Sequence, residues 1–305
     1  MKIIYLLTAM LLFQISAFGQ SDVHYSMFKL NRQIFNPAVT GANKSMTFTM
    51  HRRDQWGNFP GAPKTWTFQG HTPVFHEKVG LGISFISEEI GIYKTNMVSL
   101  NYAYHISLGE KSMLRIGGLA EFSHATVRWE MADALDLQDV TLGVSESRTR
   151  ANAGAGIFYE LGEFYVGFSI PKLLINNLYS ESGAIPSSVL NLRTYYFQIG
   201  TAFQLRENLA LSPGILIATN PSAPFEFDVN VNLLMFDKIG VGFAYRFQDS
   251  ADAILQYKLN NQFKIAAGFD FTVSGLQESA PSSYEVLMQY ELKYENNGIH
   301  NIRFF

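Results

Sequence analysis

In its C-terminal half the chain reads Phe225-Glu226-Phe227-Asp228-Val229-Asn230-Val231-Asn232-Leu233, with apolar and polar residues in strict alternation. Two further runs, Ile239–Gln248 and Phe263–Thr272, repeat this scheme. A period of two places the two sets of side chains on opposite faces of a β-strand. Each run has about ten residues, the length with which a tilted strand crosses a bilayer. The pattern predicts an all-β fold, a transmembrane antiparallel β-barrel whose strands face lipid on one side and the lumen on the other.

The composition agrees with a wall that is half polar. Among 305 residues there are 25 Phe and 15 Tyr, yet the mean hydropathy is only +0.03. Polar lumen-facing residues explain this balance, because they offset the apolar lipid-facing ones. The chain has no Cys, which excludes disulfides and thiolate metal sites. The net charge of −3 offers no basic surface for nucleic acid, so no nucleic-acid partner is expected.

Residues 1–19 have the organisation of a secretory signal peptide. A lysine precedes the apolar run Ile3–Phe13, and the small residues Ala17 and Gly19 suit a signal peptidase that cleaves before Gln20. The alternative, an N-terminal anchor helix, is disfavoured because the apolar run is too short to span a bilayer. Beyond this region no apolar run reaches about 18 residues, so no membrane-spanning helix is predicted.

Residues 20–42 do not fit a strand. Met27, Leu30 and Ile34 fall at helical spacing, and Pro37 stops a helix at the residue before it. We predict a short helical segment that plugs or braces the periplasmic mouth of a barrel formed by residues 43–305.

About fourteen strands are predicted, each near the length expected of a membrane-spanning strand. They lie near Asn43–Arg53, Lys64–Val74, Lys78–Ser87, Thr95–Ser107, Ser112–Ala125, Arg150–Tyr159, Phe164–Ile170, Asn191–Gln204, Asn208–Thr219, Phe225–Met235, Lys238–Phe247, Ala251–Leu259, Gln262–Thr272 and Ser283–Leu292.

The connections alternate in length. Every second one is short and polar, as in Phe75-His76-Glu77, whereas most of the others are longer, as in Asp54–Pro63 and Glu88–Lys94. Outer-membrane barrels have short periplasmic turns and longer extracellular loops. The protein is therefore predicted to lie in the outer membrane, with both termini in the periplasm. One connection, Gln248–Ser250, is short although it lies on the side of the longer loops, so it does not fit this alternation of lengths.

The alternation also assigns side chains to the two faces. Val98, Leu100, Tyr102, Tyr104 and Ile106 are predicted to face lipid in one strand, and Tyr284, Val286, Met288, Tyr290 and Leu292 in the last. The lumen-facing set carries both signs of charge, which predicts a network of ion pairs rather than a selective ring of one sign. Its members include Glu121, Glu160, Glu226, Asp228, Arg246, Lys264, Asp270, Glu285 and Glu291.

No motif for catalysis is present. The chain lacks a Gly-rich phosphate loop, a His-Glu-x-x-His sequence and a nucleophile elbow. Its histidines fall on separate strands or turns without the clustering that a metal site needs. We expect no enzyme activity, no metal and no other cofactor.

The first long loop holds the candidate binding residues. It contains Arg53, Gln55 and Trp56, and Gly61 and Pro63 follow at its far end. Pro and Gly fix a turn geometry, and Trp with Arg is the pair most enriched at binding hot spots. Alternatively, Trp56 anchors the loop at the membrane interface and Arg53 pairs with a nearby carboxylate.

Three motifs carry a family resemblance. They are Asn36-Pro37-Ala38-Val39-Thr40-Gly41, Arg53-x-Gln55-Trp56 and Gly61-Ala62-Pro63-x-Thr65. Together with later matches such as Tyr245-Arg246 and Gly268-Phe269-Asp270-Phe271, they make nearly the whole mature chain resemble the PorP/SprF family. One departure is Val39-Thr40, where the family more often has an aromatic and a small residue.

The resemblance implies an outer-membrane protein of the type IX secretion system and gliding machinery. It further implies a role in exporting a secreted adhesin or other cargo with a C-terminal secretion domain, or in holding that cargo at the surface. Asn36, Pro37 and the loop residues Arg53, Gln55, Trp56, Gly61 and Pro63 are the candidate binding residues. Other secretion components are possible partners. The rival interpretations are a diffusion channel for small or apolar solutes, and a soluble β-protein.

Overall fold

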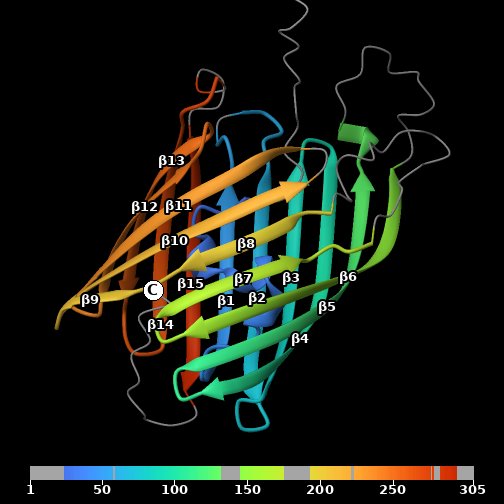
Figure 1. The fold of residues 1–305 in the computed structure, drawn as a ribbon. Coiled ribbons are helices and arrows are strands. Elements are labelled where there is room, and N and C mark those ends of the chain that lie inside the picture. Colours follow the sequence, from blue (N-terminus) through green and yellow to red (C-terminus); the bar gives the residue numbers. More distant parts are fainter. Residues whose placement is uncertain are drawn as a thin grey trace, which may run out of the picture.

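The computed structural model describes residues 24–57, 59–131, 145–174, 193–220, 223–275, 277 and 282–293. The predicted signal peptide, residues 1–19, lies outside them. The strand segments of the described chain form one sheet (Figure 1). They are β1 Ser45–Asp54, β2 Lys64–Val74, β3 Val79–Ile90, β4 Tyr93–Gly109, β5 Ser112–Val127, β6 Glu146–Leu161, β7 Phe164–Ile170, β8 Tyr195–Gly200, β9 Phe203–Arg206, β10 Leu209–Asn220, β11 Ala223–Met235, β12 Ile239–Arg246, β13 Ser250–Lys258, β14 Phe263–Thr272 and β15 Ser282–Lys293.

The sheet closes on itself. The last strand, β15, pairs antiparallel with β1 from Ser45↔Lys293 to Asp54↔Tyr284. Among the 15 strands of the sheet, β8 and β9 both pair with the same edge of β10 and share one place in the wall, which leaves fourteen places. The predicted antiparallel barrel of about fourteen strands is confirmed.

A proline explains why one predicted strand is split. The prediction gave a continuous strand at Asn191–Gln204, but the structure separates β8 from β9 around Thr201. The Thr201 amide donates to the Pro213 carbonyl at 3.2 Å, and proline has no N–H with which to return a ladder bond. The Ser212 hydroxyl instead donates to the Thr201 carbonyl at 3.0 Å. The wall therefore has an irregular point facing β10.

Several strands run further than predicted at the long-loop end. The predicted loop Glu88–Lys94 is wrong, because β3 continues to Ile90 and β4 starts at Tyr93. Glu89 and Lys94 face each other across the two strands and form a salt bridge of 2.8 Å. Gly91, with a φ of 57°, allows the tight turn between them. The sequence predicted a longer connection here, whereas the structure shows a tight hairpin tip.

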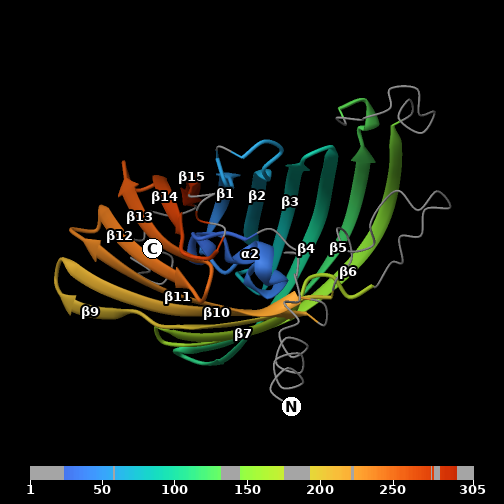
Figure 2. The ribbon, with the colours of Figure 1, turned by 90° about the horizontal axis from the view of Figure 1, so that it is seen from above.

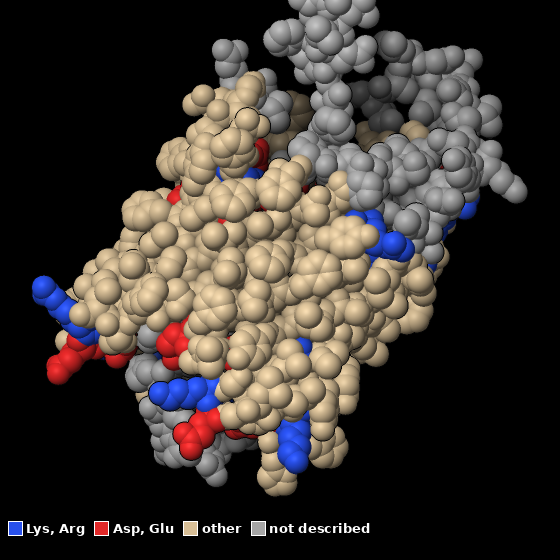
Figure 3. Space-filling model, viewed as in Figure 1, with Lys and Arg blue, Asp and Glu red and all other residues tan. Residues whose placement is uncertain are grey.

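The two faces of the wall follow the predicted alternation. Leu100 is 61% exposed on the outer face, whereas its neighbour Asn101 is 5% exposed toward the lumen. The outward residues predicted for the last strand are all exposed, and most of the predicted lumen charges are buried. A broad band of the visible outer face carries no Lys, Arg, Asp or Glu, and many of the charged side chains in this view lie near the short-turn end (Figure 3). Such a band matches the apolar belt of a membrane barrel.

The lumen is occupied by the N-terminal segment, residues 24–42. Its helical turns are η1 Phe28–Leu30, α2 Arg32–Phe35 and η2 Pro37–Val39, and α2 lies inside the ring of strands (Figure 2). Nearly all residues from Tyr25 to Gly41 are buried. None of the helices in the described part of the chain is long and apolar enough to cross a membrane.

The segment runs along the lumen rather than across its mouth. His24 lies 3.1 Å from Glu226, near the long-loop end of β11. Gly41 contacts the short-turn end of β3, because a Cβ there would lie 2.5 Å from the Gly80 Cα. The prediction of a plug-like helical segment is confirmed, and the segment reaches from the long-loop end of the lumen to its short-turn end.

Candidate functional site: a filled lumen and its long-loop face

Inward-facing glycines make room for the N-terminal segment. A Cβ atom on any of three of them would collide with this segment: at Gly80 it would lie 1.9 Å from the Thr40 carbonyl oxygen, at Gly117 2.3 Å from the Ala38 nitrogen, and at Gly156 2.2 Å from the Asn36 Oδ1. These glycines belong to β3, β5 and β6. Glycine in a strand often marks such a close approach of backbones. The wall and the segment are therefore built to fit each other.

Near the long-loop end, one carboxylate holds the start of the segment. Glu285 on β15 accepts hydrogen bonds from the backbone amides of Ser26 at 2.8 Å and Met27 at 3.2 Å. The His51 Nε2 lies 3.1 Å from the same carboxylate, and Arg53 forms an ion pair with it. Glu285 thus joins β1, β15 and the N-terminal segment.

Arg53 is part of this cluster and is only 2% exposed. Besides Glu285, its guanidinium pairs with Asp270 at 3.0 Å and donates to the Ser26 hydroxyl at 3.3 Å. Buried charges in proteins are paired in this way because desolvation of a lone charge is costly. Arg53 does not offer its guanidinium to a docking partner, so its predicted place on the docking surface is corrected. It pairs with carboxylates, as the alternative interpretation held.

Further hydrogen bonds attach the segment to other sides of the wall. Four strands take part through these pairs: Lys29 with Ser212, Asn36 with the Ile157 carbonyl at 3.0 Å, Ser169 with the Phe35 carbonyl at 2.6 Å, and His105 with the Thr40 carbonyl at 3.0 Å. These contacts on β4, β6, β7 and β10 lie on the side of the ring away from β15, where Glu285 holds the start of the segment. It is fixed across the full width of the lumen.

Asn36 and Pro37 stabilise the N-terminal segment inside the barrel. The Asn36 side chain accepts from the Ala38 amide at 3.0 Å and so caps η2. Pro37 is the first residue of η2, where a proline loses no helical hydrogen bond. Both residues are buried against the wall. The structure therefore places these two candidate binding residues inside the barrel and away from any partner at the surface.

The first long loop has a fixed backbone. The Gln55 amide donates to the Pro63 carbonyl at 2.9 Å and closes the loop at its base. Gly61, with a φ of 73°, accepts from the Gly91 amide at 2.8 Å. The loop is thus held to the β3–β4 tip. Gln55, Gly61 and Pro63 shape this loop, as the Pro and Gly content predicted.

Trp56 and Phe59 are the large side chains of this loop. Trp56 is half-buried, has a φ of 51° and donates its backbone amide to the Ser283 hydroxyl at 3.2 Å. Phe59 is 49% exposed. Both aromatic side chains lie at the long-loop end of the barrel, and Phe59, which was not among the candidate residues, is the more exposed of the two.

A second tryptophan, Trp66, lies on the outer face of the wall near the long-loop end of β2. Trp66 is 40% exposed on the outer face of β2, and the Arg52 guanidinium lies 4.6 Å from its ring centre. Arg52 also pairs with Asp54 at 2.7 Å. Tryptophan at a strand end suits the aromatic girdle of a barrel. The alternation could have found it, because Arg52 and Trp66 face each other on neighbouring strands.

The lumen charges are paired, as predicted. Arg246 bonds to Asp228 at 2.9 Å and to Asp249 at 3.2 Å, and Arg115 pairs with Glu160. With the Arg53 cluster, these pairs place both signs on the lumen wall. The arrangement balances charge in the wall rather than presenting one sign to a passing ion.

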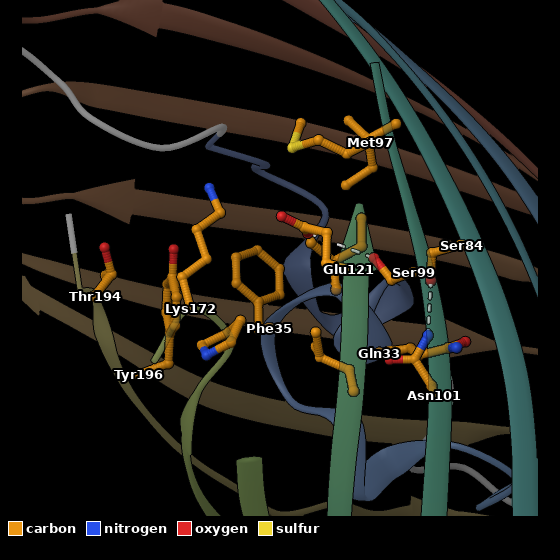
Figure 4. A pocket seen from close by; sticks show the side chains of 14 residues that line it. Gln33, Phe35, Ser84, Met97, Ser99, Asn101, Glu121, Lys172, Thr194 and Tyr196 are labelled. Atoms are coloured by element: carbon orange, nitrogen blue, oxygen red, sulfur yellow. Dashed lines mark hydrogen bonds between the residues drawn. The ribbon is translucent and has the colours of Figure 1, made fainter. Parts of the chain in front are cut away.

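A pocket lies above the N-terminal segment, between α2 and the long-loop halves of β3, β4, β5 and β8. It encloses about 670 Å³, its open mouth included. Figure 4 shows Lys172, Thr194 and Tyr196 on one side, and Ser84, Ser99 and Asn101 on the other, with Phe35 between them. Because α2 forms its floor, the pocket ends inside the barrel.

These features define a class of protein: a membrane β-barrel whose lumen is filled by its own N-terminal segment. Solved structures with a similar fold include the Acinetobacter baumannii outer membrane protein Omp33, with a TM-score of 0.48 at 9% identity, covering 82% of this chain and 99% of that one. The CymD monoaromatic hydrocarbon channel has a TM-score of 0.50 at 9% identity, covering 87% and 93%. The Pseudomonas putida toluene transporter TodX has 0.47 at 9%, covering 91% and 96%. At such identities the likeness concerns the fold alone.

Residues 17–290 match the family described as Type IX secretion system membrane protein PorP/SprF. The chain belongs to this family. The protein is therefore an outer-membrane barrel of type IX secretion, as the sequence motifs indicated. No curated protein matches the chain.

Proposed function

We propose that this barrel is a non-catalytic accessory of type IX secretion that binds a secreted adhesin or other cargo. It does so through the cargo's C-terminal domain, and it helps to export the cargo or to retain it at the cell surface. Other secretion components in the outer membrane or periplasm are proposed as neighbours on the strength of family membership.

The observation that carries this proposal is the filled lumen. The N-terminal segment forms hydrogen bonds with β4, β6, β10 and β15, and glycines of the wall leave room for its backbone. Because the fixed segment fills the lumen, the barrel serves to hold its loops in place and not to let solutes pass. This supports a binding role over the rival role of a diffusion channel, which needs an open lumen.

The docking surface is proposed at the long-loop face. The first long loop has a rigid backbone that presents Trp56 and Phe59, and the outward-opening pocket lies in the same end of the barrel. Aromatic side chains on a pre-organised backbone are favourable anchors, because little conformational entropy is lost when they bind.

Deletion of the gene tests the function. The cargo should then be trapped or degraded, and its amount on intact cells, measured with an antibody, should fall. Normal surface display in the deletion strain would show that the barrel is not needed.

Alanine variants of the loop test the docking surface. Trp56→Ala with Phe59→Ala should weaken cargo retention about tenfold or more, the usual effect of removing aromatic hot-spot residues. Phe75→Ala is the matched control, because Phe75 is 74% exposed but lies on a short turn. The measurement is cargo retained on washed cells, normalised to folded barrel. Equal losses in both strains would argue against docking at this loop.

A further inference from the structure

On the outer face of β2 to β5, the side chains change in kind toward the long-loop end. These four strands lie side by side in the ring (Figure 2). Cross-strand pairing aligns their outward residues in rows, and successive rows are about 7 Å apart, which is two residues along a strand. Three rows follow one another: an apolar row of Phe68, Phe85, Val98 and Phe122, a polar row of Trp66, Ser87, Asn96 and His124, and a charged row of Lys64, Glu89, Lys94 and Thr126.

The first two rows mark the edge of the surface that faces lipid. The side chains of the apolar row are 40% to 61% exposed. In the polar row, the Ser87 hydroxyl donates to the Asn96 Oδ1 at 2.8 Å, and the His124 Nδ1 lies 2.9 Å from the Thr149 hydroxyl on β6. Aromatic and polar side chains at strand ends lie at the level of the lipid headgroups. The charged row, which comes next, therefore lies beside or just beyond the headgroups.

The charged row gathers three cations around one carboxylate. Glu89 pairs with Lys94 at 2.8 Å, and the guanidinium of Arg128, which follows β5, lies 3.8 Å from the same carboxylate. Lys64 faces Glu89 across the two strands and is exposed, yet among the residues that the structure describes it forms no ion pair. The positive charge of this row is therefore only partly balanced.

Two other acids near this row already have partners. Asp54 pairs with Arg52 at 2.7 Å, and the Glu130 carboxylate accepts from the Ser145 hydroxyl at 2.5 Å. With Arg52 included, four cations (Arg52, Lys64, Lys94 and Arg128) face three carboxylates (Asp54, Glu89 and Glu130). The cluster keeps a positive charge that an anion can neutralise.

The other side of the barrel shows a different surface at the same height. The long-loop ends of β11, β12, β14 and β15 carry exposed aromatic residues on the outer face, namely Phe225, Tyr245, Phe271 and Tyr284. A general girdle would be alike all round the barrel. The cations of the charged row therefore mark a particular place on the wall.

We propose that the outer face of β2 to β5 binds the phosphate-bearing headgroup of a membrane lipid at the long-loop end. The acyl chains lie against the apolar row, and Lys64, Lys94 and Arg128 meet the phosphate. Lysine and arginine are the usual partners of phosphate, and anionic lipids attract such side chains at a membrane surface. A free anion has no chains with which to use the apolar row. The inference does not depend on cargo binding, because it concerns the side of the wall that faces the membrane.

Native mass spectrometry of the purified full-length barrel in a neutral detergent measures this binding. The probes are dioleoyl phosphatidic acid, dioleoylglycerol, which has the same chains and no phosphate, and inorganic phosphate. We expect phosphatidic acid to bind at least about tenfold more tightly than dioleoylglycerol. Inorganic phosphate at the same concentration should not displace it.

Paired lysine variants assign the binding to the charged row. Lys64→Gln with Lys94→Gln should weaken phosphatidic acid binding about thirtyfold, the effect of losing two cations at an anionic headgroup. Lys64→Arg with Lys94→Arg should retain the binding, because both charges remain. Lys44→Gln with Lys111→Gln is the matched control, since it removes two exposed lysines at the short-turn end. The mobility of unheated protein in gel electrophoresis shows that each variant is folded.

Equal binding of phosphatidic acid and dioleoylglycerol would overturn the inference, as would unchanged affinity of the Lys64→Gln, Lys94→Gln protein. An equal loss in the control variant would show that net charge alone attracts the lipid, and it would also overturn the proposed site. Displacement by inorganic phosphate would show a site for a free anion and not for a lipid.

Discussion

At the scale of single residues, Arg53 shows how burial changes the meaning of a motif. Arg beside Trp suggested a binding hot spot. In the structure, Arg53 points into the lumen, because it lies on the same face of β1 as the buried residues Thr49 and His51. There it meets Glu285 and Asp270, which lie more than 200 positions away in the chain. The motif correctly indicated that Arg53 makes strong polar contacts, but these contacts are with carboxylates of the barrel wall.

Removal of Arg53 should destabilise the folded barrel. Arg53→Ala leaves Glu285 and Asp270 buried without their cation, which costs about 3–5 kcal/mol. Arg52→Ala is the control, because Arg52 pairs with Asp54 on the outer surface and should cost less than about 1 kcal/mol. The measurement is unfolding in urea, followed by the mobility of unheated protein in gel electrophoresis. Equal stability of the two variants would show that the buried cluster contributes little.

At the scale of elements, the strands follow from local pattern and the N-terminal segment does not. Alternation predicted the wall strands, including Lys64–Val74 with the bounds of β2. The split between β8 and β9 was missed because its cause, Pro213, lies on the neighbouring strand. The position of the helical turns was also missed, since it depends on glycines of three distant strands.

The fit between segment and wall gives a prediction for neighbouring glycines. Gly117→Ala places a Cβ 2.3 Å from the Ala38 nitrogen, whereas at Gly118 the nearest contact is 3.7 Å, to the Gly154 carbonyl. The first change should displace the segment, cost about 1–3 kcal/mol and raise ion conductance in planar bilayers. Gly118→Ala should behave as the unmodified protein, which we expect to be silent. Strong conductance of the unmodified barrel would favour the channel interpretation.

At the scale of the whole molecule, closure of the sheet gives the barrel two different ends. In the described chain the short turns, such as Phe75-His76-Glu77, lie at one end, and the first long loop lies at the other. The first described residue, His24, lies toward the long-loop end. The proposed docking surface lies at that same end, so the proposed function requires this end to face the outside of the cell.

Cysteine labelling tests this orientation directly, because the chain has no Cys of its own. Phe59→Cys should react with a membrane-impermeant maleimide on intact cells. His76→Cys, exposed on a short turn, should react only after the outer membrane is opened. The reverse pattern would show that the long-loop end faces the periplasm, and it would remove the basis for docking at the long-loop face.

The sequence by itself determined the class of fold, the faces of the strands, the paired charges of the lumen and the family. These follow from period-two alternation, connection length and motif order, which are local properties of the chain. Only the tertiary structure decided that the lumen is filled, that Arg53, Asn36 and Pro37 are internal, and that a pocket with Gln33 at its floor opens toward the long loops. Those features depend on which distant residues closure of the barrel brings together, and no local pattern encodes that.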